Sequence, residues 1–137
     1  MNLALILLGS LASPLFLLVI EKILPYPYIL EEILKLIFVL LYIGQEKVYK
    51  TTLFNYVILS GLLFAFSESI FFLTNILALQ TYNIFFLRLV LTSILHATTI
   101  SVIYFCSKRT KYGWLLGLLL AMVIHYIYNS AVMSFQI

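Results

Sequence analysis

Ionisable side chains stand inside several strongly apolar segments of this 137-residue chain. A bilayer or a protein core makes such groups costly, so each one indicates a function or a specific partner. Carboxylates and imidazoles accept and return protons, and a cluster of them can activate water for hydrolysis. No acid–base pair in the sequence singles out a serine or cysteine as a nucleophile. The groups are Glu31, Glu32, Lys35, Glu68, His96 and His125.

The spacing of these residues favours particular pairs. Lys35 follows Glu31 by four residues and Glu32 by three, so on a helix it can pair with either carboxylate. His125 and Asn129 are four residues apart and share one helix face. An imidazole and an amide on one face can donate hydrogen bonds to a developing oxyanion.

The composition excludes most soluble classes. Hydrophobic residues make up 64% of the chain and charged residues 9%, with a mean hydropathy of +1.15. A soluble domain of this size cannot bury so much apolar surface, whereas a membrane protein exposes it to lipid. The net charge of +3 comes from short basic clusters and indicates topology rather than nucleic-acid binding. The sequence therefore predicts an all-α integral membrane protein.

Five apolar runs are long enough to be helices of one transmembrane domain covering residues 1–137. Lys47 and Lys50 lie in one connector and the KRTK cluster, 108–111, in another. Both connectors fall on the same side, which the positive-inside rule makes cytoplasmic, together with the N-terminus. The predicted spans are residues 3–24, 28–44, 52–79, 84–107 and 112–135.

The candidate residues fall at similar depths in four of these spans. With a rise of 1.5 Å per residue from the cytoplasmic face, Glu31 and Glu32 lie about 18–20 Å deep. On the same count, Glu68 lies at about 24 Å, His96 at about 17 Å and His125 at about 20 Å. We therefore expect one polar layer, formed by side chains from separate helices around a hydrated site inside the membrane.

The order of these motifs resembles that of the PrsW family of intramembrane proteases, within the superfamily of CAAX prenyl proteases and bacteriocin-processing enzymes (CPBP or Abi). Glu68 stands where CAAX-type members have histidine, and Arg88, eight residues before His96, also fits the PrsW pattern. The motifs are Glu31-Glu32-x-x-Lys35, Phe64-x-x-x-Glu68, His96 and His125-x-x-x-Asn129.

The resemblance implies a role for each residue in a glutamic-type hydrolysis. It implies that Glu31 is the general base that activates water and that Glu32 supports it. It implies that Glu68 and His96 hold this water or relay its proton. By the same resemblance, His125 and Asn129 stabilise the oxyanion. Lys35 and Arg88 are the supporting residues. We expect no metal cofactor; the set that could hold zinc instead is Glu68, His96 and His125.

The function predicted is an intramembrane endopeptidase of a prokaryotic cell membrane. By resemblance, its substrate is a membrane-anchored protein, such as an anti-sigma-factor-like regulator. The alternatives are a non-catalytic scaffold or immunity protein of the same superfamily, a CAAX-type prenyl-protein protease, and a proton- or ion-coupled carrier, which also places acids and histidines inside the membrane.

Overall fold

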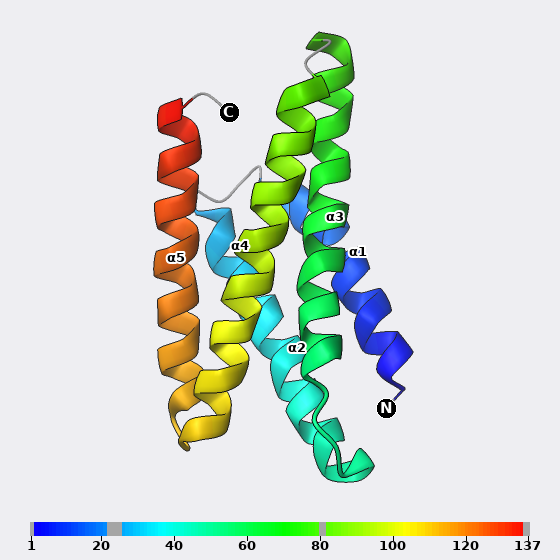
Figure 1. The fold of residues 1–137 in the computed structure, drawn as a ribbon, viewed down its shortest axis with the longest axis vertical. Helices are drawn as coiled ribbons and strands as arrows, with labels where there is room; N and C mark the ends of the chain where they lie inside the picture. The colour runs from blue at the N-terminus through cyan, green and yellow to red at the C-terminus, as the bar shows by residue number, and fades with distance from the viewer. Residues whose placement is uncertain (1, 22–25, 80–81, 136–137) are drawn as a thin grey trace.

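The computed structural model describes residues 2–21, 26–79 and 82–135, and this part of the chain is all-helical. The helices are long and joined by short connectors, so chain neighbours lie side by side (Figure 1). This confirms the predicted helical class. The helices are α1 (Leu3–Glu21), α2 (Pro27–Tyr49), α3 (Phe54–Leu79), α4 (Tyr82–Arg109) and α5 (Gly113–Phe135).

Helix α2 is longer than the span predicted for it. It begins at Pro27, whose fixed φ suits the first helical position. It continues to Tyr49, past the expected end at residue 44, and stops where Lys50 adopts a left-handed φ of 52°. The added turns carry Glu46 out of the apolar run. Residues 22–24 of the first predicted span lie outside the described residues.

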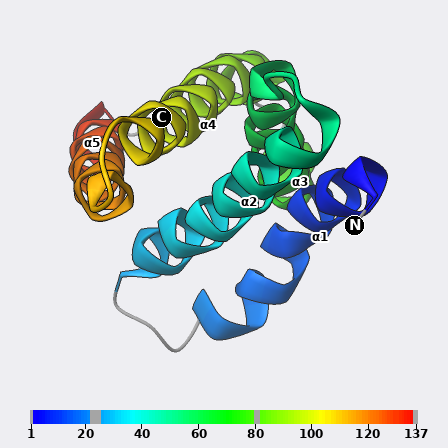
Figure 2. The same ribbon diagram turned by 90° about the horizontal axis from the view of Figure 1, so that it is seen from below.

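Helix α2 occupies the centre of the bundle and contacts all four other helices (Figure 2). Helices α3, α4 and α5 follow one another around it, and α1 packs against α2 and α3. The residues that α2 buries recur at helical spacing, and the polar ones precede the apolar ones along the helix. They are Glu31, Glu32, Lys35, Leu36, Phe38, Val39 and Tyr42.

Two glycines let α4 approach its neighbours closely. A Cβ on Gly61 of α3 would lie 2.9 Å from the backbone oxygen of His96. A Cβ on Gly117 of α5 would lie 2.9 Å from the Cα of Ile103. Both distances are too short for a side chain, so glycine sets the spacing of these helices. The close α3–α4 contact fixes the backbone that carries His96.

The outer surface of the bundle is apolar. By length and composition alone, Phe85–Arg109 and Gly113–Val132 could each cross a membrane, and Leu3–Leu17 and Phe54–Ile70 are shorter apolar stretches of the described residues. Large exposed apolar patches of this kind suit contact with lipid. That all five helices cross the membrane stays a prediction. Exposed residues of α5 include Leu115, Leu116, Leu119, Leu120, Val123 and Ile127.

Candidate active site

The first motif lies on the buried face of α2. The side chains of Glu32 and Lys35 are 0% exposed, and that of Glu31 is 8% exposed. Charges removed from water this completely need close partners, because desolvation costs several kcal/mol per ion. The partners come from α4 and α5, which α2 crosses at this level.

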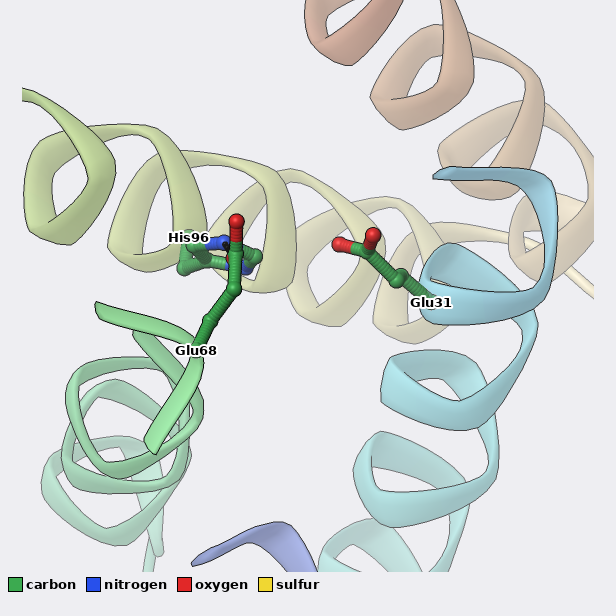
Figure 3. Close-up of side chains that lie close together, drawn as sticks. All are labelled: Glu31, Glu68 and His96. Atoms are coloured by element: carbon green, nitrogen blue, oxygen red, sulfur yellow. Dashed lines mark hydrogen bonds and ion pairs between the residues drawn. The ribbon is translucent and has the colours of Figure 1, made fainter. Parts of the chain in front are cut away.

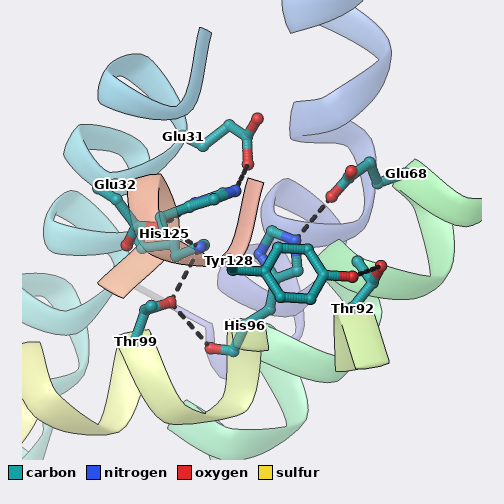
Figure 4. Close-up of polar contacts among 9 residues, drawn as sticks. Glu31, Glu32, Glu68, Thr92, His96, Thr99, His125 and Tyr128 are labelled. Carbon is teal, nitrogen blue, oxygen red and sulfur yellow. Dashed lines mark hydrogen bonds and ion pairs between the residues drawn. The ribbon is translucent and has the colours of Figure 1, made fainter. Parts of the chain in front are cut away.

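Glu32 is the centre of a buried ionic network (Figure 4). Its Oε1 accepts a hydrogen bond from Lys35 Nζ at 2.5 Å and lies 2.7 Å from His125 Nδ1. Lys35 Nζ also donates to the hydroxyl of Thr99 at 3.0 Å. Of the two carboxylates within reach of Lys35, the structure thus pairs it with Glu32. Beside the lysine ammonium, Glu32 is held as a carboxylate.

This network orients the imidazole of His125. An ionised carboxylate only accepts hydrogen bonds, so the Nδ1 that faces Glu32 carries the proton. The other ring nitrogen, Nε2, lies 3.8 Å from Glu31 Oε2. His125 therefore turns its remaining proton-accepting atom towards Glu31, in an arrangement that neighbouring carboxylates commonly impose on functional histidines.

Glu68 and His96 form a second pair beside the first network. His96 Nε2 and Glu68 Oε2 are hydrogen-bonded at 2.6 Å. The imidazole is completely buried, whereas the Glu68 side chain is 25% exposed and connects the site with the surface. The ring of Phe64 lies 5.1 Å from that of His96, and Lys35 Nζ lies 5.4 Å from the Phe64 centroid. The predicted Phe64-x-x-x-Glu68 motif thus encloses His96 from α3.

The two networks meet at Glu31. Glu31 on α2, Glu68 on α3 and His96 on α4 each offer one ligand atom, all within 4.8 Å of one another. The Glu31 carboxylate points towards the Glu68–His96 pair from the opposite side (Figure 3). The rings of His96 and His125 lie edge to face, 5.5 Å apart. Two acids and two imidazoles from four helices therefore surround one buried point.

Most of the predicted site residues come together in one cluster. Among the described residues, Asn129 is half-buried and forms no hydrogen bond with the cluster. Arg88 is half-buried about two turns before His96 on α4, and its supporting role stays a prediction. The residues of the converged cluster are Glu31, Glu32, Lys35, Glu68, His96 and His125.

Sequence reasoning missed the polar face of α4. Thr92 and Thr99 are buried one turn before and about one turn after His96. Thr99 accepts from Lys35, and the Thr92 hydroxyl lies 3.1 Å from the hydroxyl of Tyr128 on α5. The signal was present as Thr, His and Thr at positions i, i+4 and i+7 of an otherwise apolar run.

Comparison with known proteins identifies the family. The sequence model of the PrsW family intramembrane metalloproteases matches residues 11–137. The chain belongs to this family. No significant match to a curated protein or a solved structure accompanies it. As a PrsW-family protein, the chain is an intramembrane protease by family, which agrees with the buried cluster of acids and imidazoles described above and with its apolar outer surface.

Because the family is described as metalloproteases, the cluster can be tested as a metal-binding site. Two carboxylates and one imidazole are ligands that suit zinc, with a fourth position left for water. The three atoms of Glu31, Glu68 and His96 lie close enough for such a site to form with small side-chain movements. These residues fit a metal. His125 is not among the residues whose ligand atoms lie within 4.8 Å of one another, so Glu31 replaces it in the predicted zinc set.

Proposed function

We propose that this PrsW-family protein is an endopeptidase that cleaves a membrane-anchored protein with a water held among Glu31, Glu68 and His96. The observation that supports this most directly is the convergence of three ligand-capable groups from three helices within 4.8 Å. Each of the three is largely buried except Glu68, whose exposed edge gives water a way in. A purely structural ion pair between Glu68 and His96 does not need a second acid aimed at the same point.

Glu31 is the base in this mechanism. Its carboxylate accepts the proton of the water, and the resulting hydroxide attacks the carbonyl carbon of the substrate. A divalent ion held by Glu31, Glu68 and His96 would make a bound water acidic enough to lose a proton near neutral pH. A carboxylate has two oxygens, so Glu31 can hold an ion with one and accept a proton with the other.

His125 passes the proton onward. Its Nδ1–H is anchored by Glu32, and Nε2 lies 3.8 Å from Glu31, so Nε2 takes the proton and gives it to the leaving amine. Lys35 keeps Glu32 ionised and thereby keeps the imidazole in this tautomer. We assign Asn129, one turn beyond His125, to the oxyanion, because its amide is a donor on the same helix face.

The experiment is cleavage in liposomes by Glu31→Gln. We expect peptide-bond cleavage to fall by about 10²–10⁴-fold, the usual contribution of a positioned base. The matched control is Glu46→Gln, the same chemical change at a carboxylate outside the cluster, which should retain its cleavage rate per folded molecule. A membrane-anchored anti-sigma-factor-like regulator is the first substrate class to test. Cleavage by Glu31→Gln at the wild-type rate would refute the mechanism.

Metal dependence is measured separately. Elemental analysis of the purified protein and of Glu68→Ala should show zinc or another divalent ion in the first and not in the second. Activity lost to a chelator and restored by the ion would support the metal site. Full activity in a preparation with less than about a tenth of an equivalent of metal would instead support water activation by Glu31 alone.

A further inference from the structure

A groove runs along the outer face of α4, away from the active site. Its volume is about 760 Å³, and it is lined mainly by α4 residues from Ile94 to Arg109, with Ile58 of α3 and Leu120 of α5 at its sides. The α4 residues that line it point away from the bundle: Phe105 is 52% exposed, whereas His96 is fully buried. The groove is therefore a second site on the opposite face of the helix.

The length and lining of the groove suit an acyl chain. From Ile94 to Arg109 the helix extends about 22 Å, more than the ~15 Å half-thickness of the hydrocarbon core. The hydroxyl of Ser101 donates to the backbone oxygen of Ala97 at 2.6 Å, so it offers no unsatisfied polar group to a ligand. Ala97 and Ser101 are small and leave space between the larger residues.

One end of the groove is basic. Arg109 lines it, with Lys108 and Lys111 nearby in the chain. Lys108 Nζ is already bound to Glu46 Oε2 at 2.8 Å. Arg109 is exposed and forms no ion pair with a carboxylate in the described parts of the chain. Its guanidinium can therefore bind a phosphate bidentately at the level where the apolar lining ends.

We propose that this groove binds one anionic glycerophospholipid, with an acyl chain along α4 and the phosphate on Arg109. A neutral apolar segment would leave Arg109 without a counter-charge, and a lipid supplies both parts in one molecule. The site is independent of the proposed hydrolysis, because it uses the face of α4 opposite His96. It gives the protein a preference among membrane lipids.

The test is lipid binding by native mass spectrometry of the detergent-solubilised protein. Phosphatidylglycerol and phosphatidylcholine with identical acyl chains are titrated separately. Near a membrane surface one basic residue contributes about a fivefold preference for negative charge, so the first phosphatidylglycerol should bind about fivefold or more tightly than phosphatidylcholine. Arg109→Gln should remove this preference and leave phosphatidylcholine binding unchanged. Ser101→Phe, which fills the groove, should weaken both lipids.

The matched control is Lys47→Gln, the same loss of charge at a position of α2 outside the groove. It should retain the preference for phosphatidylglycerol. Equal affinities for the two lipids, or an equal loss in Lys47→Gln and Arg109→Gln, would refute the site. A dimer that Ser101→Phe dissociates would show that a second copy fills the groove instead. Arg109 is exposed, so its variant tests the proposal even if Ser101→Phe fails to fold.

Discussion

Glu46 and Glu32 both lie on α2 near several hydrogen-bond donors, but at different levels of the bundle and in different surroundings. Glu46, near the end of α2, accepts from the backbone N–H of Leu53 at 2.7 Å, from Tyr104 at 2.5 Å and from Lys108 at 2.8 Å. These donors satisfy both of its oxygens. Glu46 therefore ties α2 to the connector and to α4, and its environment is that of a structural ion pair.

The cluster around Glu32 is less completely satisfied. Glu32 Oε2 and His96 Nδ1 are buried and have no hydrogen-bond partner among the described residues. Unsatisfied polar atoms in a core cost about 1–3 kcal/mol each and are retained where function requires them. The comparison indicates that the Glu46 group holds the fold together, whereas the Glu32 group is arranged for chemistry at some expense of stability.

The largest difference should appear when each lysine is removed. Lys35 is fully buried and Lys108 has a side chain that is 37% exposed. Lys35→Met leaves a buried carboxylate without its cation, so we expect the free energy of unfolding to fall by about 3–5 kcal/mol. Lys108→Met should cost less than about 1 kcal/mol. Unfolding in mixed micelles measures both.

A double variant separates charge from packing. Glu32→Gln combined with Lys35→Met removes both charges and should recover most of the lost stability. It should stay inactive, because His125 loses the carboxylate that fixes its tautomer. If Lys35→Met and Lys108→Met destabilised the protein equally, the contrast between the two regions would be wrong.

The glycines at the helix–helix contacts offer a second contrast, with a smaller expected effect on stability. Gly61→Ala places a Cβ 2.9 Å from the His96 carbonyl oxygen, and we expect a loss of about 1–3 kcal/mol from overpacking. Because α4 must shift where it carries His96, cleavage should also fall by about 100-fold. Thermal unfolding and the cleavage rate of the folded fraction give the two values.

Two other glycines serve as controls. Gly117→Ala places a Cβ against Ile103 and so pushes α5 away from α4. It should lower the free energy of unfolding to a similar extent, with little effect on the cleavage rate. A Cβ on Gly44 would have no atom within 4 Å, so Gly44→Ala should be neutral or up to about 1 kcal/mol stabilising. Equal losses of cleavage in Gly61→Ala and Gly117→Ala would show that His96 is not sensitive to its own backbone.

The same comparison shows what the sequence could predict. The lengths of the apolar runs predicted the helices, because the length of a run is a local property of the sequence. The convergence of Glu31, Glu68, His96 and His125 followed from their similar depths. The partner of Lys35 did not follow, since Glu31 and Glu32 are both within reach on a helix. The pairing depends on tertiary contacts, in which Thr99 binds Lys35 and His125 binds Glu32.

The Glu46 group was not predicted at all, for a related reason. It depends on α2 continuing to Tyr49 and on contacts with Tyr104 and Lys108, 58 and 62 residues away. A boundary error of a few residues in α2 is enough to hide it. In the sequence alone Glu46 belonged to a charged connector, where a solvated carboxylate is the ordinary expectation.

A third contrast comes from Glu46 itself and should depend on pH. Burial raises the pKa of this carboxyl, but the hydrogen bonds from Lys108, Tyr104 and Leu53 outweigh it and hold the pKa below its ordinary value of 4.5. A depressed folded-state pKa means that Glu46 stabilises the fold above about pH 4.5, the unfolded value, and that this contribution is lost as the pH falls through the folded value.

Glu46→Gln keeps the shape of the side chain and removes its charge. We expect it to cost about 1.5–3 kcal/mol at pH 7, the usual value of hydrogen bonds to a charged group, and to cost little at a pH below the folded-state pKa. Unfolding measured from about pH 7 to about pH 3 in both proteins gives the difference. A difference that grew towards low pH would reverse the sign, and would mean that Glu46 is protonated, not ionised, where it joins α2 to α4.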